Sequence, residues 1–291
     1  MADFLNLLRV KQWIKNTFIL FPLLFSGKFF QRELFIQCLW TFLAFSLISS
    51  GLYIFNDLLD RKKDRWHPKK ALRPLARGEF NRPLVIFLIF FLNLGGLFIL
   101  ALLNSSFIYP AILFIGIHVI YNLYTKKIVI LDVIFIAFGF HIRIWTGSLA
   151  AQVIPSVWLQ LCVFLLALFL GFTKRRYELA ALKDKAAEHR GVLAHYTSYL
   201  LDQVIMICST LTIVFYGLYT ISPEMVMRVG HKNMIYSLVF VIYGIFRYLY
   251  LVHVKRLGDD PSDVLTSDLP LLTCVLSWIL YVGALIYWPK I

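Results

Sequence analysis

An amide and three carboxylates between residues 56 and 64 have a spacing suited to binding a metal ion. Asn56, Asp60 and Asp64 recur at every fourth position, and on a helix each such step advances by only about 40°. Their side chains therefore form one stripe, with Asp57 at its edge. Oxygen ligands without His or Cys suit a hard cation, and Mg²⁺ commonly joins one or two carboxylates to substrate phosphates. We predict that Asn56, Asp57, Asp60 and Asp64 hold Mg²⁺.

Basic residues follow this stripe directly. Nine lysines and arginines lie between Arg61 and Arg82, and arginine binds phosphate through a bidentate fork. Basic loops are ordinary in membrane proteins, but that explanation does not cover three aligned acceptors at a surface that repels unpaired acids. A metal stripe beside a basic loop indicates a substrate that carries a diphosphate.

Apolar helices must position this stripe. The chain of 291 residues is 60% hydrophobic, with a mean hydropathy of +0.75, and an apolar run of 18 or more residues is a candidate transmembrane helix. Little length remains for a separate soluble domain. We therefore predict an all-α integral membrane protein with a single domain, residues 1–291. The nine predicted spans are 17–30, 34–56, 82–103, 107–124, 130–150, 156–173, 197–221, 234–254 and 269–288.

The positions of the basic residues orient the chain. With nine spans, the N-terminus and every second loop share one side of the membrane, and that side holds most of the 29 lysines and arginines. This bias predicts that the stripe faces the cytoplasm, in a bacterial-type inner membrane. The net charge of +13 is confined to the mouths of the helices. Anionic lipid headgroups and a phosphorylated substrate account for it, so we expect no nucleic-acid partner.

Several polar residues lie within the predicted spans. Asp132 and Arg143 are eleven residues apart, which places them within about 20° of each other on one helix. His118, Asn122 and Lys126 recur at helical spacing in the preceding span. Ionisable groups in a membrane usually face a partner or a cavity. Two interpretations stay open for these residues, packed polar contacts that fix the helices or groups that line a substrate site.

The stripe and its surroundings resemble the first metal motif of the UbiA superfamily of intramembrane prenyltransferases. The longer string NDLLDRKKDRWHPKKALRPLARGEF is similar to the decaprenyl-phosphate phosphoribosyltransferase branch. The resemblance extends over nearly the whole chain and implies a helical bundle around a central cavity, with a polar cytosolic mouth and a lipid-accessible wall. The strings that agree with this branch are LRVKQWIKN (8–16), LDVIFIAFGFHIR (131–143), KRRYEL (174–179) and FRYLYLVHVKRLGDDPSDVLTSDLPLL (246–272).

One departure from the superfamily bears on the substrate. Members that use prenyl diphosphates carry a second Asp-rich motif after the sixth span, whereas here the string is KRRYE, with Glu178 the only acid until Asp184. The resemblance therefore implies the branch in which the diphosphate is on phosphoribose and the prenyl chain arrives as a monophosphate. The implied reaction is Mg²⁺-dependent transfer of 5-phosphoribose from phosphoribosyl diphosphate to a polyprenyl phosphate, within membrane lipids.

This resemblance assigns roles to residues of the chain. Asn56, Asp60 and Asp64 would carry the catalytic Mg²⁺, and basic residues would bind the phosphates of both substrates. For Glu178 three roles stay open, which are orienting Arg175, binding a ribose hydroxyl and ligating the metal. The residues expected to bind substrate are Lys11, Lys15, Asn16, Arg73, Arg77, Lys126, Arg143, Lys174, Arg175, Arg176, Tyr177, Glu178 and Arg190.

Two other functions remain as alternatives. The first is a prenyltransferase that moves an isoprenoid from its diphosphate to an aromatic or other acceptor. The second is a polytopic transporter without enzymatic activity. A transporter should carry midplane charges on broken helices or paired repeats, whereas the charges of this chain gather mainly at one surface.

Overall fold

The computed structural model describes residues 2–66, 70–182, 191–258 and 260–288, and these residues form helices and connecting turns with no strand. Eight helices within this part of the chain are long and apolar enough to cross a membrane. The all-α membrane fold predicted from the sequence is therefore confirmed. The spanning elements contain α3 (Arg32–Asp64), α5 (Arg82–Leu103), α6 (Ile108–Leu123), α7 (Leu131–Ala150), α8 (Val157–Leu182), α10 (Ser198–Thr220), α12 (Leu238–His253) and α14 (Leu269–Tyr287).

The first predicted span, 17–30, has a different form. It is divided between the 3-10 helix η1 (Val10–Leu20) and the short helix α2 (Phe21–Phe25), so neither part has the length of a regular spanning helix. Pro22 lacks an N–H group and cannot bond to the carbonyl of Phe18, which interrupts a continuous α-helix at this point. η1 nevertheless packs against α3 and α7 inside the bundle.

Several helices, both spanning and short, begin at capping residues that are visible in the sequence. Asn81 caps α5, and Asp268 caps α14 by accepting a bond from the Leu271 N–H. Proline at the second helical position, where a free N–H would have no partner within the helix, supports both starts. The shorter helices are α1 (Ala2–Leu8), η2 (Lys70–Leu72), α4 (Pro74–Arg77), η3 (Ser105–Phe107), η4 (Thr125–Lys127), η6 (Gly191–His195), α11 (Pro223–Val229), η7 (Lys232–Ser237) and α13 (Pro261–Ser267).

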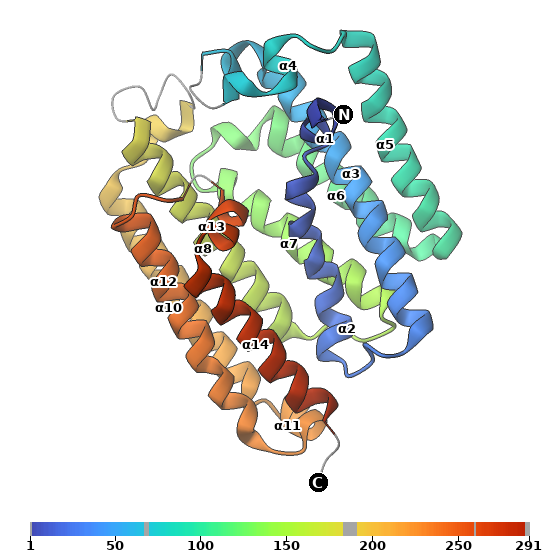
Figure 1. Cartoon of the computed structure of the whole chain (residues 1–291), viewed down its shortest axis with the longest axis vertical. Helices are drawn as coiled ribbons and strands as arrows, with labels where there is room; N and C mark the ends of the chain where they lie inside the picture. The colour runs from blue at the N-terminus through green and yellow to red at the C-terminus, as the bar shows by residue number, and fades with distance from the viewer. Residues whose placement is uncertain (1, 67–69, 183–190, 259, 289–291) are drawn as a thin grey trace.

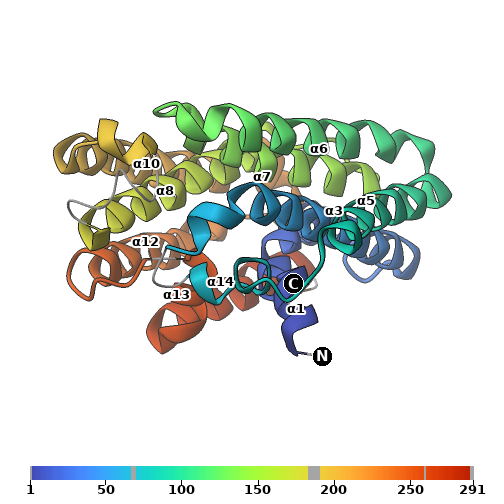
Figure 2. The ribbon, with the colours of Figure 1, turned by 90° about the horizontal axis from the view of Figure 1, so that it is seen from above.

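The helices form two packed groups. One apolar core joins α8, α10 and α12, and another joins η1, α3, α6 and α7. Seen from above, α7 and α8 lie between α6 on one side and α12, α13 and α14 on the other (Figure 2). Close approach depends on glycine where η1 meets α7, because a Cβ on Gly147 would lie 2.1 Å from the carbonyl oxygen of Ile19.

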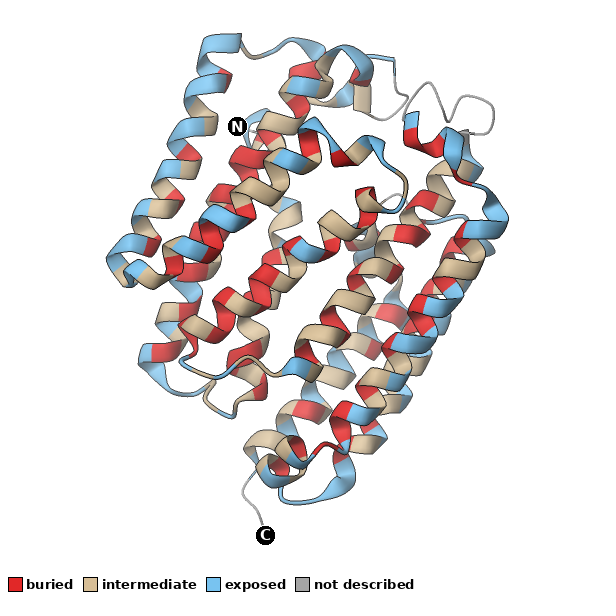
Figure 3. Cartoon of the chain, turned by 180° about the vertical axis from the view of Figure 1, so that it is seen from behind, coloured by how far each residue is buried: buried red, intermediate tan, exposed pale blue. Residues whose placement is uncertain are grey.

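The outer faces of the helices are exposed and apolar. Buried residues face inward, and pale exposed residues cover the outside of α5 (Figure 3). On α5, large apolar side chains such as Phe87, Phe91 and Leu94 are more than half exposed. Soluble proteins rarely expose continuous apolar surface of this kind. The chain is therefore a multi-pass membrane protein whose outer side chains face lipid.

Two helices carry polar residues beyond their apolar spans. α3 continues to Asp64, and α8 continues to Leu182, so Lys174 to Glu178, which follow the predicted span 156–173, lie on the same helix. The end of α3, α4 and the N-terminus lie at the same end of the bundle (Figure 1). These extensions bring the charged ends of α3 and α8 to that end of the molecule.

Candidate active site

A cavity of about 1540 Å³ opens inside the bundle, and it is lined by η1, α3, α6, α7, α8, α12, α13 and α14 among others. Its lining changes in chemistry along its length. Charged side chains come from the extended ends of α3 and α8, while deeper positions are aromatic and apolar, including Phe18, Phe140 and Trp278. The cavity can therefore hold a charged group and an apolar chain at the same time.

The stripe predicted on α3 faces this cavity. Asn56, Asp60 and Asp64 all line it, as the spacing of four residues requires. Lys126 of η4 donates to both oxygens of Asp60, at 2.8 and 3.0 Å. Arg73 donates to Asp64 at 2.7 Å. Each carboxylate of the stripe thus carries a basic partner from another segment.

Asp57 lies elsewhere. It is 5% exposed and does not line the cavity, although only about 20° around α3 separates it from Asp64. Arg9 donates to both of its oxygens, and Arg73 donates to it at 3.0 Å. Asp57 therefore fixes Arg9 and Arg73 beside the stripe, and the geometry separates it from the three residues with which the sequence grouped it.

The stripe fits a divalent cation by the chemistry of its donors. Nowhere in residues 2–66, 70–182, 191–258 and 260–288 do three His, Cys, Asp or Glu side chains gather as a metal site, so a metal held here would need the amide of Asn56 in addition to Asp60 and Asp64. All of these donors are oxygens of the kind that Mg²⁺ binds. The ammonium of Lys126 lies 2.8 Å from Asp60 Oδ1 and supplies a positive charge beside that carboxylate.

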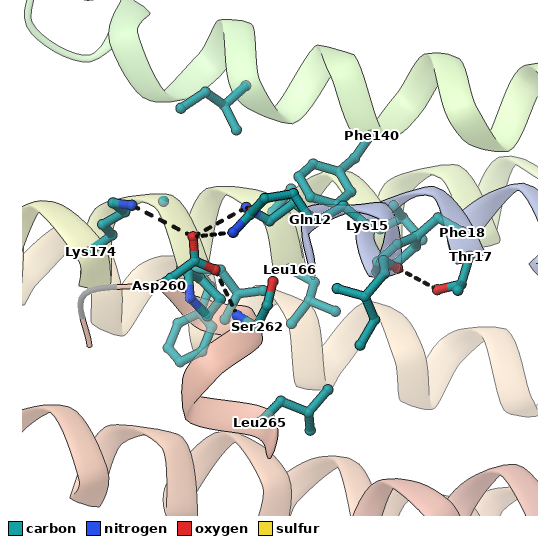
Figure 4. A pocket seen from close by; sticks show the side chains of 18 of the residues that line it. Gln12, Lys15, Thr17, Phe18, Phe140, Leu166, Lys174, Asp260, Ser262 and Leu265 are labelled. Atoms are coloured by element: carbon teal, nitrogen blue, oxygen red, sulfur yellow. Dashed lines mark hydrogen bonds and ion pairs between the residues drawn. The ribbon is translucent and has the colours of Figure 1, made fainter. Parts of the chain in front are cut away.

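Across the cavity, three side chains converge on Asp260 at the start of α13 (Figure 4). Gln12 donates to it at 3.1 Å, and the ammonium groups of Lys15 and Lys174 lie 3.5 and 4.0 Å from it. Burial alone raises the pKa of Asp260, but Lys15, Lys174 and the hydrogen bonds of Ser262 outweigh burial and hold that pKa well below its usual range. Asp260 is thus a fixed negative charge between two lysines.

Asp260 was not among the site residues predicted from the sequence. Its position before Pro261 is the pattern of an N-cap followed by proline at the first helical position, and Asp260 does accept a bond from the Ser262 N–H at 2.9 Å. That signal predicts the start of a helix. Its contacts with Lys15 and Lys174 join distant segments and have no local signature.

Arg175 is deeply buried between α7 and α8. It is 1% exposed and donates to Asp132 at 2.6 Å and to Glu178 at 2.8 Å. Tyr196 donates to the second oxygen of Asp132 at 2.7 Å. Arg175 lines the cavity together with Tyr177 and Glu178, and two carboxylates already match its charge and join the helices.

The remaining predicted residues divide between the cavity and other places. Six of them line the cavity, which are Lys11, Lys15, Arg73, Lys126, Arg143 and Lys174. Arg77 lies outside it and pairs with Asp3 and Glu79, and Arg176 pairs with Asp202. Asn16 is buried behind the wall, where it donates to Ser46 at 3.0 Å. Arg190 lies outside the described residues.

Residues 19–269 match the UbiA prenyltransferase family. The chain belongs to this family. Two curated relatives are named decaprenyl-phosphate phosphoribosyltransferase. The protein from Mycolicibacterium smegmatis is 28% identical over 98% of this chain and 93% of its own length. The protein from Corynebacterium glutamicum is 27% identical over 96% of this chain and 85% of its own.

Solved structures agree with the UbiA fold. The UbiA homolog from Archaeoglobus fulgidus bound to GPP and Mg²⁺ has a TM-score of 0.71 at 17% identity, covering 98% of this chain and 99% of that one. The same homolog bound to DMAPP and Mg²⁺ has a TM-score of 0.72 at 18% identity, covering 99% and 100%. At this identity the likeness shows the fold of this UbiA-family chain.

Proposed function

We propose that this UbiA-family transferase moves 5-phosphoribose from phosphoribosyl diphosphate to a polyprenyl phosphate and releases diphosphate. The observation that carries the proposal is the cavity itself, in which an oxygen-donor stripe with basic partners lies above an apolar and aromatic interior. Such a cavity suits two phosphorylated substrates, one of which has a long apolar chain. The names of the relatives from Mycolicibacterium smegmatis and Corynebacterium glutamicum support the same reaction.

The α3 side would bind the donor. Asn56, Asp60 and Asp64 would hold Mg²⁺, which when bound would neutralise charge on the departing diphosphate. Lys126 and Arg73, now paired with Asp60 and Asp64, would exchange these carboxylates for phosphate oxygens. Arginine and lysine are suited to this exchange because their hydrogen bonds to phosphate are charge-assisted.

The acceptor needs no general base. The oxygen of a phosphate monoester already carries negative charge at pH 7, because its second pKa is about 6. Substitution at the ribose C1 passes through an oxocarbenium-like transition state, as in other glycosyl transfers. The task of the protein is then to bring two anions together, and Lys15 and Lys174 beside Asp260 supply positive charge between the two sides of the cavity.

Transfer assays with two labelled donors separate the three candidate functions. Purified protein with Mg²⁺ would receive either labelled phosphoribosyl diphosphate with polyprenyl phosphate or labelled prenyl diphosphate with polyprenyl phosphate and an aromatic acceptor. We expect label in the lipid only with the phosphoribosyl donor. Label transferred only from the prenyl diphosphate would favour a prenyltransferase. Absence of transfer from either donor, with a folded protein, would reject both enzymatic assignments.

The orientation of the mouth has its own test. The concentration of basic residues on one side supports a mouth that faces the cytoplasm of a bacterial-type inner membrane. A cysteine introduced at the exposed Lys62 should react with a membrane-impermeant maleimide only after the cytoplasmic side is opened. Labelling of intact cells at this position would reverse the orientation.

A further inference from the structure

A buried arginine in the middle of α7 has no carboxylate partner. Arg143 is 3% exposed and lines the cavity, and among the described residues no carboxylate oxygen lies within 4.0 Å of it. Arg175, which is equally buried, has two carboxylates. A buried charge without a counter-charge is costly, and within a membrane span such a charge commonly marks a functional site.

Neutral groups hold the Arg143 side chain in one orientation. Its Nε donates to the amide oxygen of Asn16 at 2.7 Å, and its Nη1 donates to the Gly139 carbonyl at 3.0 Å. The guanidinium also lies over the rings of Phe114 and Phe140, at 4.6 and 5.2 Å from their centroids. Within the described part of the chain, nothing accepts a hydrogen bond from Nη2. The side chain is therefore rigid, with one donor edge still available.

The packing of neighbouring residues preserves room for this guanidinium. A Cβ on Gly139 would lie 2.9 Å from Cε1 of His118 and 3.5 Å from Nη1 of Arg143. His118 lines the same cavity and is fixed by a 2.8 Å contact between its Nδ1 and the Phe114 carbonyl oxygen. Glycine at position 139 thus allows His118 and Arg143 to lie side by side against the cavity.

Arg143 lies well below the metal stripe. Asp132 and Arg143 are on one helix, and their eleven-residue separation corresponds to about 17 Å along its axis. Asn16, which holds Arg143, also bonds to Ser46, and Ser46 precedes Asp60 on α3 by about 21 Å of helix. A diphosphate bound at Asp60 and Asp64 is too small to cover this distance, so Arg143 serves a different group.

We infer that Arg143, oriented by Asn16 and stacked on Phe114 and Phe140, binds a monoester phosphate within the membrane-embedded part of the cavity. An incoming dianion would supply the missing counter-charge and would accept hydrogen bonds from the available edge of the guanidinium. The source of that phosphate rests on the proposed function. It is either the 5-phosphate of the donor or the phosphate of the lipid acceptor as it enters, before that phosphate moves to the ribose C1, and one experiment distinguishes them.

The experiment measures binding without turnover. Ribose 5-phosphate represents the donor end, and farnesyl phosphate represents the lipid acceptor. Both are titrated against purified protein in detergent, as the wild type and as Arg143→Gln. We expect Arg143→Gln to weaken binding of one ligand by about ten- to a hundredfold and to leave the other within about twofold. The ligand that loses affinity identifies the source of the phosphate.

Arg247→Gln is the matched control. Arg247 also lies on a spanning helix, but it pairs with Asp268 at 2.8 Å and does not line the cavity, so its replacement should leave both affinities unchanged. Unchanged binding of both ligands to a folded Arg143→Gln protein would overturn the inference. Equal loss of both ligands would support the site as one that accepts either monoester phosphate.

A second variant keeps the test decisive if Arg143→Gln does not fold. Arg143→Lys retains the charge and loses the planar fork, so it should weaken the same single ligand by several-fold; unchanged affinity for both would again overturn the site. The proposed function fails separately. If the wild type transfers no phosphoribose while phosphate binding still depends on Arg143, the phosphate site at Arg143 is supported and the proposed reaction is rejected.

Discussion

Two sets of ion pairs at the charged end of the bundle look alike in the sequence and differ in the structure. On the α3 side, the Lys126 and Asp60 side chains are 17% and 28% exposed. Between α7 and α8, Arg175 and Asp132 are 1% and 0% exposed. Water reaches the first pair and is excluded from the second. The first pair can exchange its partner for a ligand, whereas the second holds helices together.

This difference follows from the unequal cost of breaking the two pairs. An exposed ion pair contributes about 0–1 kcal/mol, so a phosphate or a divalent cation easily displaces one of its members. Removing one partner from a buried pair costs about 3–5 kcal/mol, because the other charge is left in a medium of low dielectric constant. Burial therefore separates the ion pairs of the cavity that open at low cost from those whose loss would destabilise the fold.

The buried pair gives the largest predicted effect. Arg175→Ala should lower the free energy of unfolding by about 3–5 kcal/mol, because Asp132 and Glu178 would lose their guanidinium. Arg176→Ala is the control, since Arg176 pairs with the 41% exposed Asp202, and it should cost less than about 1 kcal/mol. Unfolding in mixed detergent measures both. Equal, small losses would show that burial does not distinguish the two arginines.

Asp60, the half-buried middle residue of the stripe, should behave in the opposite way. Asp60→Ala should reduce turnover by at least about a hundredfold, because a ligand of the proposed Mg²⁺ is lost, while the unfolding free energy changes by less than about 1 kcal/mol. EDTA should abolish wild-type activity and added Mg²⁺ should restore it. Initial rates and unfolding curves on the same preparation check this prediction. Near-normal turnover of Asp60→Ala would remove the stripe from the catalytic site.

The sequence predicted the stripe because local geometry decides it. Positions four residues apart share a helix face wherever the helix forms, and an apolar run longer than a membrane is thick predicts a spanning helix. Eight of the nine predicted spans have this form, while Pro22 interrupts the first. Local spacing also grouped Asp57 with the stripe, but the contacts of Arg9 and Arg73 hold it away from the cavity.

Long-range partners could not be predicted in this way. The pairing of Arg175 with Asp132 joins residues 43 positions apart, and the contact of Gln12 with Asp260 joins residues 248 apart. No periodicity connects such positions. Arg175 and Arg176 were therefore predicted to have the same role, although only Arg175 is enclosed by two carboxylates. The positions of the basic residues along the chain predict that charges gather at this end of the bundle. Tertiary packing decides which of these charges can exchange their ion-pair partner for a ligand.

Arg73 tests whether an exchangeable cation binds the donor. It bridges Asp57 and Asp64 and is 26% exposed. Arg73→Ala should raise the KM for phosphoribosyl diphosphate by about ten- to a hundredfold, with a smaller change for the lipid, because one charge-assisted phosphate contact is lost. Arg77→Ala, which removes a nearby arginine outside the cavity, is the control. An unchanged KM for the donor would give Arg73 a structural role.

Asp260 gives the smallest expected effect and lies between the two kinds of ion pair. Its side chain is 17% exposed, and Lys15 and Lys174 lower its pKa in the folded protein. A carboxyl with a depressed folded pKa stabilises the protein above its unfolded pKa of about 3.9, and that contribution disappears as the pH falls through the folded value. Asp260→Asn should therefore lower Tm by about 2–4 °C at pH 7.

The same deficit should remain between pH 5 and 8 and should shrink only below about pH 4, where the carboxyl begins to take up protons in the unfolded wild type but not yet in the folded protein. Thermal unfolding of both proteins across this range measures the difference. Because Lys15 and Lys174 would lose the charge that holds them, Asp260→Asn should also raise the affinity for inorganic diphosphate by a few-fold. A deficit in Tm that varies between pH 5 and 8 would assign the effect to another titrating group. A loss of diphosphate affinity would place Asp260 among the residues that bind the substrate, rather than among those that occupy its site before it arrives.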